Sequence, residues 1–138
     1  MSESNFKNFN HLKIHSQYSI CEGAIKIDVL KDRAKEFKIK SLGLCDTSNL
    51  CGAIEFSESI SKAKTQPIIG TQINFKYKEQ MGKLPLFAKN LEGYKNLIKL
   101  SSKSFLEIED NEDPHIKIED LESNYKGLIL LSGSFESL

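Results

Sequence analysis

Several short apolar runs of the sequence end in polar residues that could carry chemistry. The polar groups at these predicted strand ends are His15 and Ser16, Asp46 and Thr47, Gln72, and Ser132. In barrels built from alternating strands and helices, the carboxyl ends of the strands form the rim that carries the active site. A metal site or a hydrolytic site could form there. Strand ends also need polar caps, so position alone does not decide between these two interpretations.

The chemistry open to His15 depends on the residue two places before it. Alternate residues of a strand face the same way, so a histidine at both positions would make a chelating pair. The first position is Lys13, and a lone histidine is more often a hydrogen-bonded structural residue than a ligand. A zinc set of His15 with Cys21, Cys45 and Cys51 is disfavoured, because the spacing is irregular and Cys45 lies inside an apolar strand.

A row of lysines on a predicted helix is a second candidate site. Lys95, Lys99 and Lys103 follow a four-residue spacing that could contact phosphates, but such rows are usually the solvated face of a helix. His11 and His115 have no partners nearby in the sequence, and neither is assigned a role. No P-loop, G-x-S-x-G or G-x-G-x-x-G motif occurs, so NTP hydrolysis, acyl transfer and dinucleotide binding have no support.

Composition limits the class of protein. The chain has 138 residues, 39% of them hydrophobic and 28% charged, which is typical of one soluble globular unit. Nineteen basic residues balance nineteen acidic ones, so no overall positive field draws the chain to a phosphate backbone. Three cysteines without a C-x-x-C pair fit a reducing cytoplasm. No apolar run reaches the roughly 18 residues of a membrane span, and the first residues lack signal-peptide features. We therefore expect a cytoplasmic protein with no membrane partner.

The elements that would position these residues alternate between strands and helices, a pattern typical of a parallel sheet with covering helices. The predicted strand over residues 84–88 could pair antiparallel with its neighbour. Its Pro85 suggests that it lies at a sheet edge or that the strand starts there. The helix after it would bury Tyr94, Leu97, Ile98 and Phe105. An acidic loop is expected over 107–114. The predicted strands are 11–14, 42–45, 67–75, 84–88 and 127–133, and the predicted helices are 27–37, 53–63, 91–105 and 118–124.

The last predicted strand, residues 127–133, is apolar enough to be buried on both faces. A parallel strand that ends in Ser-Gly normally leads into a helix that covers it, and residues 134–138 are too few to form one. The pattern therefore predicts a truncated domain with missing neighbours and an unpaired sheet edge.

Three short motifs resemble those of the PHP (polymerase and histidinol phosphatase) superfamily. Residues 11–19 read HLKIHSQYS and are followed by Glu22-Gly23, where the family has H-x-H-T/S-x-Y-S and then D-G. Residues 45–50, CDTSNL, are similar to the family's T-D-H-x-N-L, and residues 68–72, IIGTQ, to its I-I-G-x-E. Three motifs in the family's order argue against a chance match.

Further segments are similar to the PHP domain that opens the alpha subunit of bacterial DNA polymerase III. They are residues 49–52 with Phe56, residues 93–97 with Leu100 and Ser101, and residues 127–133. The similarity runs from about residue 9 to residue 133. It implies an α/β fold, the N-terminal part of a distorted (β/α)7 PHP barrel that is truncated here. Residues 1–8 would be a flexible N-terminus and residues 9–138 a partial PHP domain.

The resemblance also implies a degenerate metal site. PHP enzymes hold divalent metals and hydrolyse phosphoesters, but two histidines and one carboxylate of the family's ligand set are replaced here, and an aspartate has become the longer glutamate. An ammonium or an amide is a poor ligand for these metals. We therefore expect no catalytic residue, metal or cofactor in this segment. We also expect Lys13 to pair with Asp46 or Glu22. The degenerate positions are Lys13, His15, Glu22, Thr47 and Gln72, with Asp46 and Ser132 as the supporting rim.

The function implied by the resemblance belongs to a longer parent chain, a DNA-directed DNA polymerase (a nucleotidyltransferase) that carries out template-directed synthesis. This segment would be a non-catalytic scaffold that docks the proofreading exonuclease subunit and supports the rest of the alpha chain. Mg²⁺, DNA and the sliding clamp would be bound by regions absent from this sequence. The alternative is an active metal-dependent phosphoesterase or a proofreading PHP domain that uses His15, Glu22 and Asp46. A free-standing binding module is a third interpretation.

Overall fold

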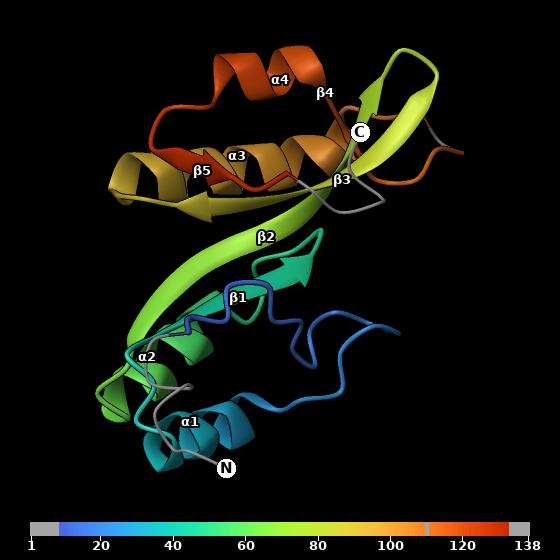
Figure 1. Ribbon diagram of the computed structural model, residues 1–138. Coiled ribbons are helices and arrows are strands. Elements are labelled where there is room, and N and C mark those ends of the chain that lie inside the picture. Colours follow the sequence, from blue (N-terminus) through green and yellow to red (C-terminus); the bar gives the residue numbers. More distant parts are fainter. Residues whose placement is uncertain (1–8, 110, 133–138) are drawn as a thin grey trace.

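A long central strand, β2 (Gln66–Tyr77), organises the fold. The computed structural model describes residues 9–109 and 111–132 (Figure 1). β2 pairs in parallel with β1 (Ser41–Thr47) and, further along, antiparallel with β3 (Gln80–Ala88). β5 (Leu128–Leu130) adds antiparallel to the far side of β3, and the two-residue β4 (Ile116–Lys117) pairs in parallel with the end of β2. The described strands therefore form a mixed sheet. The antiparallel pairing suggested for residues 84–88 is confirmed, whereas β5 is antiparallel where a parallel strand was expected.

The two halves of β2 serve two separate hydrophobic cores. Around its first half, α1 (Ile27–Glu36) and α2 (Ala53–Lys62) pack with β1, and Phe56 and Ile60 of α2 are fully buried. Around its second half, α3 (Leu91–Leu106) covers β2 and β3 through Leu97 and Leu100. Figure 1 shows β2 running from the α1 and α2 side of the molecule to the α3 side. The short α4 (Ile118–Ser123) follows β4.

The four predicted helices are confirmed with ends that agree within about one residue, because their apolar residues recur at helical spacing. The prediction of which residues of α3 are buried was partly wrong. Ile98 and Phe105 are exposed, and the buried positions besides Leu97 are Gly93, Asn96, Leu100 and Ser104. The buried amide of Asn96 is satisfied by a hydrogen bond that it donates to the carbonyl of Lys126 at 2.8 Å.

The segment predicted as a first strand, residues 11–14, lies beside β1 but forms no continuous ladder. It is held by two backbone hydrogen bonds of 2.8 Å, from Gly43 to the carbonyl of His11 and from Cys45 to that of Ile14. The approach is close, since a Cβ atom at Gly43 would lie 2.4 Å from the carbonyl oxygen of Leu12. The segment therefore aligns Lys13 and His15 with β1 without being a regular strand.

Two expectations for the other end of the sheet were wrong. Pro85 lies inside β3, opposite Gln72 of β2, and its carbonyl accepts from the Leu131 amide at 3.0 Å, so β3 is not an edge strand. The predicted strand 127–133 is regular only over β5, and the exposed fractions of Ile129 and Leu130 are 48% and 42%, so it is not buried on both faces. Residues 133–138 lie outside the described residues. Closure into a barrel and truncation stay predictions.

Within the described ranges, no helix is long and apolar enough to cross a membrane.

Candidate functional site

The buried carboxylate of Asp46, at the end of β1, is the centre of the predicted rim. Its side chain accepts three hydrogen bonds, from the Ser16 amide at 2.6 Å, the Ser16 hydroxyl at 2.8 Å and the Ser19 hydroxyl at 2.7 Å. Its exposed fraction is 1%. A buried carboxylate without a cation needs several donors of this kind. Asp46 therefore organises the loop that follows residue 15.

That loop, residues 16–25, is folded tightly against the end of β1. The Glu22 and Gly23 amides both donate to the carbonyl of Ser19, at 3.0 and 2.9 Å, and the Thr47 amide donates to the Ser19 hydroxyl at 3.1 Å. Asn49 adds a second attachment, since its amide donates to the carbonyl oxygens of Tyr18 and Thr47, each at 2.9 Å. The loop thus holds His15 and Glu22 over the strand end.

His15, Glu22 and Thr47 meet on this rim. Nδ1 of His15 lies 3.3 Å from the Thr47 hydroxyl and 3.5 Å from a Glu22 carboxylate oxygen, and the Thr47 hydroxyl donates to the same carboxylate. The ammonium of Lys83, on β3, lies 3.7 Å from the other Glu22 oxygen. The hydrogen bond from Thr47 and the charges of Lys83 and His15 hold the pKa of Glu22 below its ordinary value.

Gln72 is the neighbour of Thr47 in the parallel β1–β2 pair. Its side chain is buried, with an exposed fraction of 3%, and among the described residues no group forms a hydrogen bond with its Oε1 atom. Paired residues of adjacent strands share a face of the sheet. Gln72 therefore belongs to the same rim as Thr47, as the sequence predicts, and contributes an uncharged amide where PHP enzymes resembling this chain have a glutamate.

Two other sequence-predicted residues, Lys13 and Ser132, do not join this group. Lys13 is exposed, and in residues 9–109 and 111–132 it forms no ion pair, so the expected pairing with Asp46 or Glu22 was wrong. The Asp46 carboxylate accepts hydrogen bonds from Ser16 and Ser19, and Lys83 is the lysine that faces Glu22. Ser132 is exposed and follows β5.

The cysteines do not form a zinc set. Cys45 is buried in β1, and burial raises the pKa of its thiol to about 12, which opposes the thiolate that a metal requires. Cys21 and Cys51 are exposed. The row of lysines on α3 does not present three unpaired charges to a phosphate, because Lys103 forms ion pairs with Glu107 at 3.0 Å and with Asp120 at 2.8 Å.

The residues on the rim do not fit the metal cluster that the fold family implies. Among residues 9–109 and 111–132, no three side chains of the histidine, cysteine, aspartate or glutamate type come together in a geometry that could hold an ion. His15 and Glu22 are adjacent, but Asp46 is directed to serine donors and Gln72 offers an amide.

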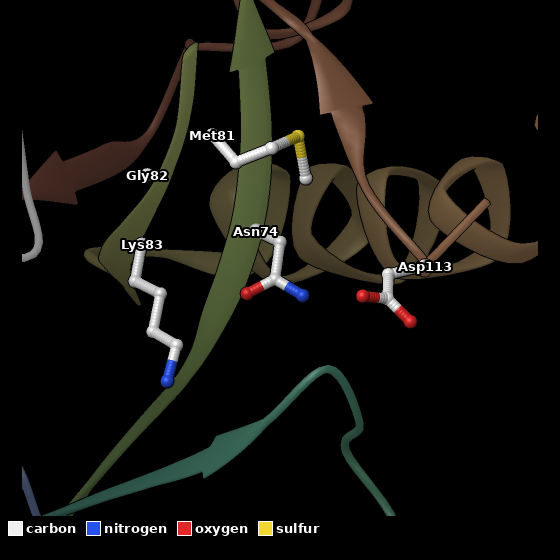
Figure 2. Close-up of a pocket in the computed structure, with 5 residues that line it drawn as sticks. All are labelled: Asn74, Met81, Gly82, Lys83 and Asp113. Carbon is white, nitrogen blue, oxygen red and sulfur yellow. The ribbon is translucent and has the colours of Figure 1, made fainter.

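Sequence reasoning missed two residues of the site. Ser19 lies within the first motif, and its position four residues after His15 was a usable signal for a contact. Lys83 gave no such signal, because it comes from a different strand and reaches the rim through the β2–β3 pairing, in which it lies opposite Asn74. A cavity of about 400 Å³ lies beside it, lined by Asn74, Met81, Gly82, Lys83 and Asp113 (Figure 2).

Comparison with known proteins gives a consistent set of relatives. A family model described as PHP domain matches residues 11–137. The DNA polymerase III alpha subunit of Helicobacter pylori is 43% identical over 109 residues, 73% of this chain and 9% of that protein. Those of Caulobacter vibrioides and Borreliella burgdorferi are 38% and 40% identical and match 96% and 94% of this chain. The chain spans about a tenth of the length of these curated relatives.

Solved structures of similar fold are more distant in sequence. A protein from Bifidobacterium adolescentis assigned as a metal-dependent phosphoesterase aligns with 70% of this chain and 34% of its own, at a TM-score of 0.52 and 14% identity. An amidohydrolase from Chromobacterium violaceum aligns with 68% of this chain and 34% of its own, at a TM-score of 0.53 and 16% identity. At these identities the likeness concerns the fold alone.

Proposed function

The chain belongs to the PHP domain family, and we propose that it is the N-terminal PHP segment of a bacterial replicative DNA polymerase, the polymerase III alpha subunit. The parent chain carries out template-directed DNA synthesis as a nucleotidyltransferase. Support comes from relatives of that name that match up to 96% of this chain at 38% identity while being much longer. The polymerase site, its Mg²⁺ and the grip on DNA belong to regions outside this sequence.

Within that parent we propose that this segment is a metal-free scaffold. The observation that carries the proposal is the composition of the rim, where Glu22 contacts a threonine, a histidine and a lysine rather than a set of metal ligands. An ammonium close to the carboxylate opposes the approach of a divalent cation. The scaffold supports the rest of the alpha chain and docks the proofreading exonuclease subunit. The sliding clamp contacts other regions.

The alternative function is a metal-dependent phosphoesterase or a proofreading nuclease site. The observation that favours it is the contact of His15 with Glu22 at 3.5 Å, in a chain whose fold is similar to that of a protein assigned as a metal-dependent phosphoesterase. In this alternative the remaining ligands would come from residues outside the printed sequence, and His15→Ala would abolish hydrolysis.

The two functions are separated by assaying the full-length protein for primer extension and for phosphate release in parallel. We expect primer extension in the native protein and in the His15→Ala variant alike, and no release of phosphate from phosphomonoesters or of nucleotides from a DNA 3′ end by either. The intact polymerase activity serves as the control for folding. Mn²⁺-dependent hydrolysis by the native protein that His15→Ala removes would establish the alternative and contradict the scaffold.

A further inference from the structure

Three separate elements of the fold meet at the carboxylate of Glu22. The loop 16–25 supplies Glu22 itself, the end of β1 supplies the Thr47 hydroxyl, and the middle of β3 supplies the ammonium of Lys83. In the sequence these residues are 25 or more positions apart, so the group forms only when the loop closes onto the sheet. The side chains of Glu22 and Lys83 are 37% and 35% exposed, so solvent reaches the pair but does not surround it.

The position of Lys83 is set by the β2–β3 hairpin. It lies opposite Asn74, one residue before the buried Leu84, and two residues before Pro85, the partner of Gln72. Figure 2 shows its side chain directed away from Met81 and Asp113, toward the part of the sheet where β1 lies. Asn74 is itself fixed, because its amide donates to the carbonyl of Pro114 at 3.0 Å. The hairpin therefore presents the ammonium to the rim from a defined place.

With Lys83 in this place, both carboxylates of the rim have polar partners. Asp46 is satisfied by the three hydrogen bonds from Ser16 and Ser19. Gln72 is an uncharged amide, which leaves the Glu22 carboxylate as the group that needs a cation. Lys13, the lysine at a family ligand position, is exposed and does not reach it.

We propose that the ammonium of Lys83 takes the place of a bound cation at this rim and holds the loop 16–25 onto the β2–β3 hairpin. The proposal rests on the metal-free part of the proposed function and extends it to the residue that makes the metal unnecessary. A single ammonium is sufficient because the Asp46 carboxylate already accepts three hydrogen bonds, which leaves Glu22 as the carboxylate that lacks a full set of donors. The same ammonium repels a divalent ion, so the loss of metal ligands and the placement of Lys83 reinforce each other.

Amide hydrogen exchange of the loop in the full-length protein tests the attachment. In Lys83→Met, exchange of the Glu22 and Gly23 amides, which bond to the carbonyl of Ser19, should accelerate by about twofold to fivefold. Lys89→Met, which removes the same charge from an exposed lysine just after β3, is the control and should leave these amides unchanged. Glu22→Gln should match Lys83→Met, and the double variant should add nothing further.

Equal exchange in Lys83→Met and Lys89→Met would overturn the proposal. So would additive effects of Lys83→Met and Glu22→Gln, because Lys83 would then act on something other than Glu22. Local exchange remains informative even where a variant lowers global stability, since amides in α3 report global opening in the same sample.

Titration with Mn²⁺ tests the replacement of a cation. The full-length variant carrying Lys13→His, Thr47→His and Gln72→Glu restores the family's ligand types, and adding Lys83→Met to it should tighten Mn²⁺ binding by about tenfold or more. Adding Lys89→Met instead should not. Equal affinities of the two four-substitution variants, including undetectable binding by both, would overturn this role of Lys83.

These outcomes are distinguishable from failure of the proposed function. Stoichiometric metal in the unsubstituted protein would contradict the metal-free scaffold whatever Lys83 does. A metal-free native protein in which Lys83→Met behaves as Lys89→Met would contradict the role of Lys83 and leave the scaffold in place.

Discussion

Asp46→Ala is expected to lower the free energy of unfolding by about 3–5 kcal/mol, the largest effect of any single substitution on the rim. Asp46 is almost completely buried and accepts from the Ser16 amide and from the Ser16 and Ser19 hydroxyls. Alanine leaves three donors without an acceptor in a dry environment, and a lost hydrogen bond to a charged group costs about 1.5–3 kcal/mol. Urea denaturation followed by circular dichroism measures the change.

Two comparison variants make this result specific. Asp46→Asn keeps the shape but turns one acceptor into a donor, so we expect a smaller loss of about 2 kcal/mol. Asp28→Ala removes a carboxylate of α1 that is exposed and pairs with Lys31, and its cost should stay below about 1 kcal/mol. A loss below about 1 kcal/mol for Asp46→Ala would mean that the loop 16–25 does not depend on this carboxylate.

Gly23→Ala is expected to destabilise the protein by about 2–3 kcal/mol through crowding rather than through a lost contact. A Cβ atom at this position would lie 2.1 Å from the carbonyl oxygen of Ser16 and 2.8 Å from that of His15. Both are backbone atoms, so relief requires the loop to move away from the strand end. That movement carries His15 and Glu22 apart.

The matched control is Ala24→Ser, one residue further along, where the side chain is exposed. Its effect on the free energy of unfolding should lie within about 0.5 kcal/mol of zero. Denaturation curves of the two variants in the same buffer provide the comparison. If Gly23→Ala were as stable as Ala24→Ser, the close packing of the loop against residues 15 and 16 would be wrong.

Features of the fold that repeat along the chain were predictable from the sequence. The helical spacing of Ile27, Leu30 and Ala34 predicts α1 and the face it buries, and these residues are indeed in the core. The outer residues of α3 were less predictable. Ile98 and Phe105 are apolar but exposed, whereas Gly93 lies on the buried face of the helix, where a Cβ atom would lie 1.8 Å from the carbonyl oxygen of Gly127. Spacing does not reveal such an approach.

Contacts that depend on strand pairing were not predictable from local patterns. Pro85 suggested an edge strand, but it lies inside β3, opposite Gln72 of β2, and its carbonyl accepts a hydrogen bond from the Leu131 amide on the other side of the strand. The motifs placed His15, Glu22, Thr47 and Gln72 on one rim. The cation that faces Glu22 was assigned to Lys13, because the motif contains that lysine, whereas the register of the hairpin brings Lys83 there.

The central claim, a rim without metal, is tested most directly by elemental analysis of the native full-length protein purified without chelators. We expect less than about 0.1 zinc, manganese or iron ion per chain, because the Lys83 ammonium lies beside the Glu22 carboxylate and Gln72 contributes no negative charge. One or more tightly held ions per chain, lost on His15→Ala, would contradict it.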